Sequence, residues 1–455
     1  MSQLTKQQYD LKAGWPESAS NQASAKDLQN SIHPLVNEQD LDVLLDQIGT
    51  SRYVLLGEAS HGTAEFYTWR AAISRRLIQE KGFTLIAVEG DWPDAYALNQ
   101  YIRGDDKPGR VRQVLRRFNR WPTWMWANEE IAQLAEWLRE YNDRTGLNTS
   151  QVGFYGLDVY SLWESLDEIQ QTLTRIDSPL LALAQEVHNC FAPYRRDEQT
   201  YALGTLHGRQ CDRPVADLLH ALQTAPMPEL NPDERFALIQ NGYVVAEAER
   251  YYYTMVRDGN ESWNVRDRHM AQTLDRLMDF HGSNAKVIIW AHNTHVGDAR
   301  YTDMTDENMI NLGQLVRERH GDEGVYIVGF GTYEGEVIAS HRWGAPYQRL
   351  PVPKAQSGSW GDILHSISSQ DKLLLLDQLR NTPDLTSRRG QRAIGVVYRP
   401  EREWGNYVPT NLPQRYDCFI YLDWTTALHP LGVAETQQGK SEDAPRNEYS
   451  VINDA

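Results

Sequence analysis

The stretch "LLGEASHGTAEFYTWR", Leu55 to Arg70, predicts a buried strand that runs directly into a helix. Its first residues are apolar on both faces, as in a strand buried between two layers, and its last residues have helical spacing. The ionisable residues Glu58, His61, Glu65 and Arg70 lie around this junction. A strand that feeds a helix is typical of α/β proteins.

Similar apolar runs recur along the chain and alternate with helical patterns. The predicted strands cover residues 52–58, 83–90, 151–158, 286–293, 325–333, 392–398 and 417–423. Several of them are apolar on both faces, which a sheet covered by helices on each side requires. We therefore predict an α/β fold with a mostly parallel sheet, helices on both faces and an all-helical inserted lobe.

The strand signal stops between the third and fourth of these strands, where only helical spacing is found. We predict a helical insertion at this place and polar segments at both ends of the chain. The expected divisions are a polar N-terminal arm (1–35), a first part of the α/β core (36–160), the helical insertion (161–280), a second part of the core (281–430) and a disordered tail (431–455).

Composition indicates a globular protein with a sizeable core, because 41% of the 455 residues are hydrophobic and 24% are charged. The formal net charge of −17 opposes binding to nucleic acids and anionic lipids. The basic run at residues 110–120 has the pattern of a solvated helix face. No apolar run is long enough to span a membrane. The expected partner is therefore a small molecule, and the sequence does not give the oligomeric state.

The cysteine pattern predicts three free thiols, because Cys190, Cys211 and Cys418 are scattered and form no CxxC pair. We expect a reducing compartment and, since the first residues contain no apolar segment, a cytoplasmic location. The 14 Trp and 23 Tyr residues suit a pocket for a large, partly apolar ligand. For the segment "RWPTWMW" (120–126), the mouth of a cleft and core packing are both open.

Polar residues follow four of the predicted strands at the points where the strands end. Ligands of open α/β sheets bind beyond the carboxyl ends of the strands, so these residues predict one site. They are Glu58 and His61; Glu89, Asp91, Trp92 and Asp94; Asp158; and His292, His295 and Asp298.

The helix after His61 is expected to begin after Thr63 and to end at Gly82. At about 100° per residue, Arg70 lies about 40° from Phe66, inside the apolar stripe of this helix. A guanidinium among core side chains needs a carboxylate or a bound anion. Glu58 or Glu89 is the expected partner, either in a functional site or in a structural ion pair.

His61 is the candidate base, since it lies three residues after Glu58 and just beyond a strand end. A carboxylate that accepts from one ring nitrogen fixes the tautomer and makes the other nitrogen a stronger base. Such a pair activates a water or a hydroxyl group. A serine nucleophile is disfavoured, because the G-x-S-x-G pattern requires glycine two residues before Ser60 and this position is occupied by Glu58.

Phosphate-binding signatures are missing, because neither GxxxxGK[ST] nor a GxGxxG after a strand occurs. The HExxH signature of zinc hydrolases is also missing. We expect no cofactor and keep a divalent metal held by Glu58, His61, His292 and His295 as an alternative.

Taken together, these motifs resemble those of the erythromycin esterase family, which includes proteins labelled succinoglycan-biosynthesis-like. The resemblance runs from about residue 35 to residue 430, with its motifs in the family's order. They are "LLGEASHGTAEFYTWRAAISRRLIQEKGFTLIAVEGDWPDAYALNQYIRG", "SWNVRDRHMAQTL", "VIIWAHNTHVGD", "RAIGVVYRPERE" and "RYDCFIYLDWTTALHPL". The resemblance implies an α/β core with a helical lobe over a deep cleft. It also implies hydrolysis of the lactone ester of macrolide antibiotics by a histidine-activated water, generally without a metal.

The resemblance assigns the family's motif residues to positions in this chain. Its G-E-x-x-H motif falls on Gly57, Glu58 and His61, and its helix arginine falls on Arg70. The acid at the end of the second strand is Glu89, and the H-x-x-H loop is His292 to His295. Family esterases often carry a glutamate a few residues after that acid, where this chain has Asp94. The motifs are those of a broad branch of relatives, so the substrate is not carried over with them.

The mechanism we expect is ester or lactone hydrolysis by a water that His61 deprotonates, with Glu58 orienting the ring. Arg70, His292 or His295 would stabilise the oxyanion, and Glu89 would hold Arg70 or a second water. Two other classes remain open: a metal- or haem-type binding protein, since distant relatives of this fold are thought to bind haem iron, and a transferase for a small metabolite. The expected substrate-contacting residues are Asp91, Trp92, Asp94, Arg266 and Asp267, although the last two could instead only tie the lobe to the core.

Overall fold

A mostly parallel sheet forms the centre of the protein, as expected for an α/β fold. The structure, a computed structural model, describes residues 22–104, 109–145 and 151–432, except for the side chains of residues 22–25 and 384. Nine strands make the sheet, in the order β1-β8-β11-β6-β2-β5-β3-β4, with β7 paired to β6. The strands from β11 to β4 in this order are all parallel, so their carboxyl ends lie at one edge.

The strands are short, apart from β6. Their bounds are β1 Ile32–Pro34, β2 Tyr53–Leu56, β3 Leu85–Val88, β4 Gly153–Gly156, β5 Val287–Trp290, β6 Val325–Ala339, β7 Gln348–Val352, β8 Lys372–Leu375 and β11 Cys418–Thr425. A separate antiparallel pair is formed by β9, Arg389–Arg392, and β10, Tyr407–Thr410.

Helices cover both faces of this sheet. Successive strand residues point to opposite faces, so each strand packs against both helix layers. Leu56 and Val88 pack into one apolar layer, and Leu55 and Leu85 pack into the other. The first layer includes α2 (Asp42–Ile48), α3 (Ala64–Lys81), α4 (Trp92–Arg103), α5 (Val111–Leu115) and α6 (Glu129–Thr145). The second includes α12 (Gly259–His281), α14 (Leu312–His320) and α15 (Trp360–Ile367).

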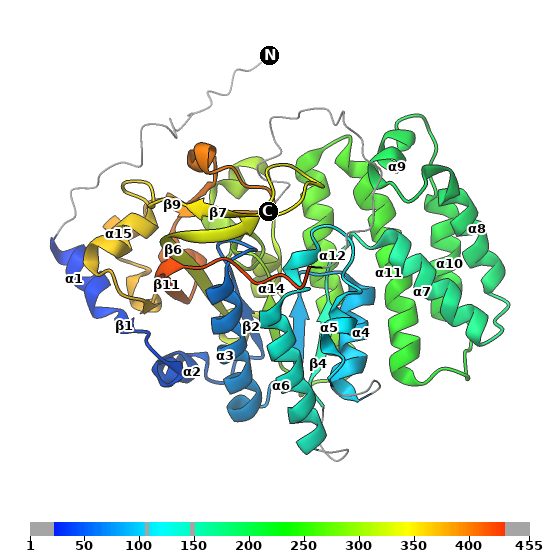
Figure 1. Ribbon diagram of the computed structural model, residues 1–455, viewed down its shortest axis with the longest axis horizontal. Coiled ribbons are helices and arrows are strands. Elements are labelled where there is room, and N and C mark those ends of the chain that lie inside the picture. Colours follow the sequence, from blue (N-terminus) through cyan, green and yellow to red (C-terminus); the bar gives the residue numbers. More distant parts are fainter. Residues whose placement is uncertain (1–21, 105–108, 146–150, 433–455) are drawn as a thin grey trace.

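The helical stretch predicted between the third and fourth strands is confirmed, because α7 to α12 lie between β4 and β5. In Figure 1, α7 to α11 lie together at one side of the molecule. A third apolar cluster, which includes Leu166, Val187 and Val245, forms their own core. The helices are α7 Leu162–Arg175, α8 Leu181–Phe191, α9 Glu198–Thr205, α10 Asp212–Thr224, α11 Pro232–Met255 and α12. The division into domains stays a prediction.

The prediction of a strand at residues 392–398 is wrong. Apart from Arg392, which ends β9, this segment makes only isolated bridges, from Ile394 to Ser60 and from Val397 to Ser340. It crosses the carboxyl edge of the sheet, and the backbone N–H of Ile394 donates to the carbonyl of Ala59 at 2.8 Å. The apolar run therefore covers the end of β2 instead of entering the sheet.

Part of the predicted N-terminal arm has regular structure. Helix α1, Gln22–Asn30, precedes β1, and β1 pairs with β8 at the edge of the sheet. The remainder of the arm, residues 1–21, and almost all of the predicted tail, residues 433–455, lie outside the described residues. No helix in the described ranges is long and apolar enough to cross a membrane.

The prediction of three free thiols is also wrong. Cys190 in α8 and Cys211, at the start of α10, form a disulfide, and Cys418 is free and buried in β11. The two cysteines are 21 residues apart in sequence, a spacing with no CxxC signature, and the fold of the helical stretch brings them together. The expectation of a reducing compartment depends on unpaired cysteines, and the paired Cys190 and Cys211 do not support it.

Candidate active site

The strand–helix junction from Leu55 to Arg70 builds a buried chain of charges. Nδ1 of His61 lies 2.8 Å from Oε1 of Glu58, and Nη2 of Arg70 donates to Oε2 of the same carboxylate at 2.5 Å. All three side chains are buried. Because the carboxylate can only accept, Nδ1 of His61 carries the proton and Nε2 is left as the basic atom.

Arg70 faces the core, as its place in the apolar stripe predicts. Its guanidinium lies 4.6 Å from the ring centres of both Tyr67 and Trp290. Of the two expected carboxylate partners of Arg70, Glu58 is the one that contacts it, whereas Glu89 pairs with Arg266. Arg70 therefore holds the Glu58 carboxylate in place, and this carboxylate in turn orients His61. Arg70 itself does not line the pocket that is described below.

Local structure at the junction follows the sequence closely. Helix α3 begins after Thr63 and ends at Gly82, whose φ of 71° is the left-handed conformation that favours glycine. Thr63 does not cap the helix with its side chain, because its hydroxyl pairs with that of Ser60. The Glu65 carboxylate accepts from the backbone N–H of Thr426 at 2.8 Å and so ties the helix to the end of β11.

A second buried network surrounds Glu89, at the end of β3. Nη2 of Arg266 donates to Oε1 of Glu89 at 2.6 Å, and the backbone N–H of His292 donates to Oε2 at 2.8 Å. Arg266 also holds Asp158 through two hydrogen bonds of 2.9 and 2.7 Å. Nε2 of His295 lies 3.4 Å from Oε1 of Glu89. The ends of β3, β4 and β5 thus meet on one arginine of α12.

Neighbouring charged residues determine the pKa values of the two acids in this network, Glu89 and Asp158. Burial alone would raise the pKa of Glu89, but His295 and Arg266 outweigh it and hold this pKa below its ordinary value. Burial likewise opposes ionisation of Asp158, and Arg266 again lowers the pKa below the ordinary value. Both groups are therefore carboxylates at neutral pH.

The two histidines of the H-x-x-H loop have opposite environments. Burial, and next the neighbouring His61, hold the pKa of His292 well below its ordinary value, so this ring is neutral. Burial also lowers the pKa of His295, but Asp267 and Glu89 outweigh it and raise this pKa above its ordinary value. The ring centres of His61 and His292 lie 4.9 Å apart, so the loop reaches the base candidate.

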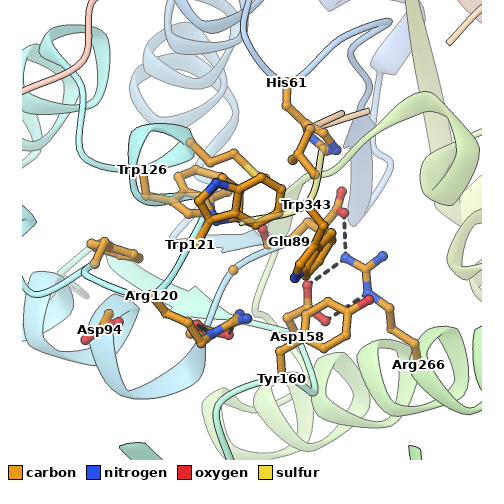
Figure 2. Close-up of a pocket in the computed structure, with 16 residues that line it drawn as sticks. His61, Glu89, Asp94, Arg120, Trp121, Trp126, Asp158, Tyr160, Arg266 and Trp343 are labelled. Carbon is orange, nitrogen blue, oxygen red and sulfur yellow. Dashed lines mark hydrogen bonds and ion pairs between the residues drawn. The ribbon is translucent and has the colours of Figure 1, made fainter. Parts of the chain in front are cut away.

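A pocket opens over these two networks, which we call the central pocket. It leaves about 640 Å³ free of protein atoms, counting space open to solvent. In Figure 2, His61 and Asp94 lie at opposite ends of the view, with Trp121 between them. The lining residues are His61, Glu89, Gly90, Asp91, Asp94, Phe118, Arg120, Trp121, Pro122, Met125, Trp126, Asp158, Tyr160, Arg266, Trp343 and Val396.

Three of the five residues expected to contact substrate line the central pocket: Asp91, Asp94 and Arg266. The other two do not line it. Trp92 packs in the second apolar layer with its ring 5.8 Å from that of Tyr155. Asp267 is fully buried and accepts from Nδ1 of His295 at 3.0 Å, so it supports the histidine.

Several lining residues were not among the predicted site residues. Arg120 belongs to the basic run expected to be a solvated helix face, yet it pairs with Asp91 at 2.7 Å inside the pocket. Trp343 comes from the loop between β6 and β7, and its ring lies 4.4 Å from that of Trp121. The segment 120–126, for which both roles were open, supplies lining residues and also the core residue Trp124.

The histidines do not form a metal-ligand set. Nδ1 of His61 contacts Glu58, Nδ1 of His292 accepts from the backbone N–H of Thr294, and Nδ1 of His295 contacts Asp267. Within residues 22–104, 109–145 and 151–432, no group of three or more His, Cys, Asp or Glu side chains could hold a metal ion. The alternative of a metal at Glu58, His61, His292 and His295 therefore has no matching geometry.

Comparison with known proteins identifies relatives over most of the chain. A family model described as erythromycin esterase matches residues 78–425. Erythromycin esterase type II of Escherichia coli is 23% identical over 326 residues, which cover 68% of this chain and 75% of that protein. A putative hydrolase of Bacillus subtilis, YbfO, is 22% identical over 415 residues, which cover 86% of this chain and 87% of that protein.

Solved structures share the fold. A succinoglycan biosynthesis protein superposes with a TM-score of 0.72 at 21% identity, over 91% of this chain and 100% of that one. An erythromycin esterase, EreC, in its open conformation gives a TM-score of 0.64 at 18% identity, over 88% of this chain and 97% of that one. The fold common to these proteins extends over both the core and the helical stretch.

Proposed function

The chain belongs to the erythromycin esterase family, and from this premise we propose that it hydrolyses a carboxylic ester or lactone with a water that His61 activates. The observation that carries the proposal is the buried chain from Arg70 through Glu58 to His61. His61 lines the central pocket, and its Nε2 makes no hydrogen bond to any described residue. A water beside that nitrogen would lose its proton as it attacks the carbonyl carbon.

His292 does not line the central pocket, but its ring centre lies 4.9 Å from that of His61, and it is the residue that we assign to the oxyanion. Its Nδ1 accepts from the backbone N–H of Thr294, so the proton of the neutral ring lies on Nε2. This Nε2 is buried and has no hydrogen-bond partner within the described part of the chain. A preorganised donor of this kind is typically worth about 3 kcal/mol in the transition state. Arg70 is a positioning residue in this scheme, because its guanidinium is committed to Glu58.

Glu89 and Arg266 organise the floor of the pocket. The Glu89 carboxylate holds the backbone N–H of His292 at 2.8 Å and thereby sets where the H-x-x-H loop begins. Arg266 compensates the buried charges of Glu89 and Asp158. His295, held by Asp267, joins this network through Glu89. We assign these groups to positioning of the loop and of the substrate carbonyl.

The lining favours a substrate with a large apolar part. Phe118, Trp121, Met125, Trp126 and Trp343 supply apolar surface, while the charged groups gather at the ends of the strands. Such a pocket binds ring systems by burial and orients them through a few polar contacts. Macrolide lactones are one class of this kind, and the family name refers to one of them.

Hydrolysis of a defined panel tests the proposal. Purified protein is incubated with aryl esters, alkyl esters, small lactones and erythromycin, and products are identified by mass spectrometry. We expect ring opening or ester cleavage with addition of one water. His61→Ala should abolish it, whereas His207→Gln, a change of an exposed histidine in the helical stretch, should not. Absence of turnover on the whole panel would refute the proposal, and turnover that requires an added alcohol or amine acceptor would instead indicate transfer.

A further inference from the structure

A second cavity adjoins the central pocket, between the core and the helical stretch. It leaves about 970 Å³ free of protein atoms, counting space open to solvent. We call it the side pocket. Its acidic lining residues are Asp94, Glu164, Asp167, Glu168 and Glu198, against two arginines, Arg117 and Arg196. Asp94 lines both cavities, so the two meet at this residue.

The arginines of the side pocket are already neutralised. Nη2 of Arg117 donates to Glu168 at 2.6 Å, and Nη1 of Arg196 donates to Asp167 at 2.7 Å. Arg196 also lies 3.5 Å from one oxygen of Glu164. These pairs leave an excess of negative charge in the wall formed by Asp94 and Glu164.

Asp94 is the clearest candidate for a ligand contact in the side pocket. Its residue is only 6% exposed, yet its carboxyl group makes no hydrogen bond or ion pair with any described residue. Buried carboxylates are normally paired, because an isolated buried charge is costly. Burial, and next the neighbouring charges of Asp91 and Glu164, raise the pKa of Asp94 well above its ordinary value. Arg117 and Arg120 act on this carboxyl group from a distance and do not contact it, so Asp94 has no direct cationic partner among the described residues.

Two further polar atoms of the side-pocket lining are unsatisfied. Oε2 of Glu164 is buried and has no hydrogen-bond partner, and the same holds for Nε1 of Trp163. Trp163 is itself only 4% exposed. The carboxylate oxygen needs a donor and the indole N–H needs an acceptor, so one ligand that carries both functions would satisfy the two residues.

The chemistry of the wall distinguishes an organic cation from a metal ion. No group of three or more acidic, histidine or cysteine side chains in the described ranges could hold a metal ion. The wall offers instead two separated carboxylates beside an aromatic ring, an arrangement that suits a protonated amine with its apolar substituents.

We propose that the side pocket binds a protonated amine, with Asp94 and Glu164 as its counter-charges and Trp163 donating to a nearby oxygen of the same ligand. The inference rests on the proposed function where it names the substrate class: an ester or lactone with its carbonyl at His61 and an amino-alcohol part in the side pocket. Binding of the amine itself does not depend on hydrolysis.

Direct binding tests the site without a substrate. Protonated diethylaminoethanol is titrated into the protein and followed by calorimetry, beside the uncharged alcohol in which a CH group replaces the nitrogen. We expect saturable binding of the amine alone. Asp94→Asn should weaken it at least tenfold, and Glu164→Gln, which removes a second charge without touching the central pocket, should do the same. Asp217→Asn, a change of an exposed acid on α10, is the matched control for net charge.

The outcomes separate the two proposals. Equal binding of amine and alcohol, or unchanged amine binding in both folded variants, would overturn the site. Amine binding without turnover of any ester would support the site and refute the hydrolase. With turnover, matched esters that differ only in the charged nitrogen should differ in KM, and this difference should disappear in Asp94→Asn.

Discussion

Nη2 of Arg70 and Nδ1 of His61 contact the two different oxygens of one carboxylate, that of Glu58, at 2.5 and 2.8 Å. The arginine reaches it from α3, and the histidine comes from the loop between β2 and α3. A carboxylate held at both oxygens cannot rotate, so the imidazole that it holds is fixed as well. This relationship explains why the junction carries so many ionisable groups.

Arg70→Gln should lower kcat about tenfold to a hundredfold and leave KM nearly unchanged, because it frees Glu58 to turn without altering the pocket lining. Loss of the buried partner should also cost about 3 kcal/mol of unfolding free energy. Steady-state kinetics and denaturant unfolding check both. Arg70→Lys, which keeps the charge, should recover part of kcat. An unchanged kcat in a folded Arg70→Gln protein would contradict the positioning role.

Trp343→Ala should raise KM for bulky apolar esters about tenfold with little change in kcat, because its ring forms part of the apolar lining beside Trp121. The effect should shrink for small esters that do not reach the ring. Trp424 is 57% exposed and lines neither described pocket, so Trp424→Ala is the matched control. Equal losses for small and large esters would argue against a substrate contact.

Sequence patterns predicted the parts of this site that local spacing controls. The three-residue step from Glu58 to His61 and the helical angle between Phe66 and Arg70 are short-range geometry, and both hold in the structure. The convergence of strand ends also holds, because parallel strands must end at one edge. Gly57, at the end of one of these strands, also has a local explanation, since a Cβ there would collide with the side chain of Asn293.

Sequence patterns did not predict directions of side chains or contributions from loops. Arg266 and Asp267 are neighbours on α12, about 100° apart, so one reaches the pocket while the other supports His295. Trp92 starts α4 and turns toward the second apolar layer. Trp343 lies in a loop without periodicity, so only the folded chain could place it in the pocket.

Acidification should destabilise the protein through Glu89 and Asp158. The pKa values of both carboxyl groups are lower in the folded protein than in an unfolded chain. The stabilisation that the two carboxylates contribute is therefore complete above the unfolded pKa values of about 4, and it is lost as the pH falls from there toward the folded values. Denaturant unfolding from about pH 6 to pH 3 measures the slope. Glu89→Gln should reduce the loss of unfolding free energy between pH 6 and pH 3 by about 1–2 kcal/mol. Parallel curves for the two proteins would contradict the assignment.

The disulfide predicts one free thiol in the unfolded, unreduced protein, although the chain has three cysteines. Thiol titration in denaturant measures this directly, and the intact mass should be lower by two hydrogens. Replacing both Cys190 and Cys211 by serine should cost about 2–4 kcal/mol, because the unfolded chain loses a cross-link. Three reactive thiols in protein purified without reductant would contradict the pairing.

Chemical rescue of a His61→Ala variant is the most direct test of the central claim that this imidazole activates the water. The substitution should lower kcat for the best ester of the panel about a thousandfold, since general-base catalysis contributes about 10²–10⁴-fold. Added imidazole should restore part of that rate in the variant and leave the wild-type rate unchanged. Full activity of the folded variant without imidazole would contradict the account.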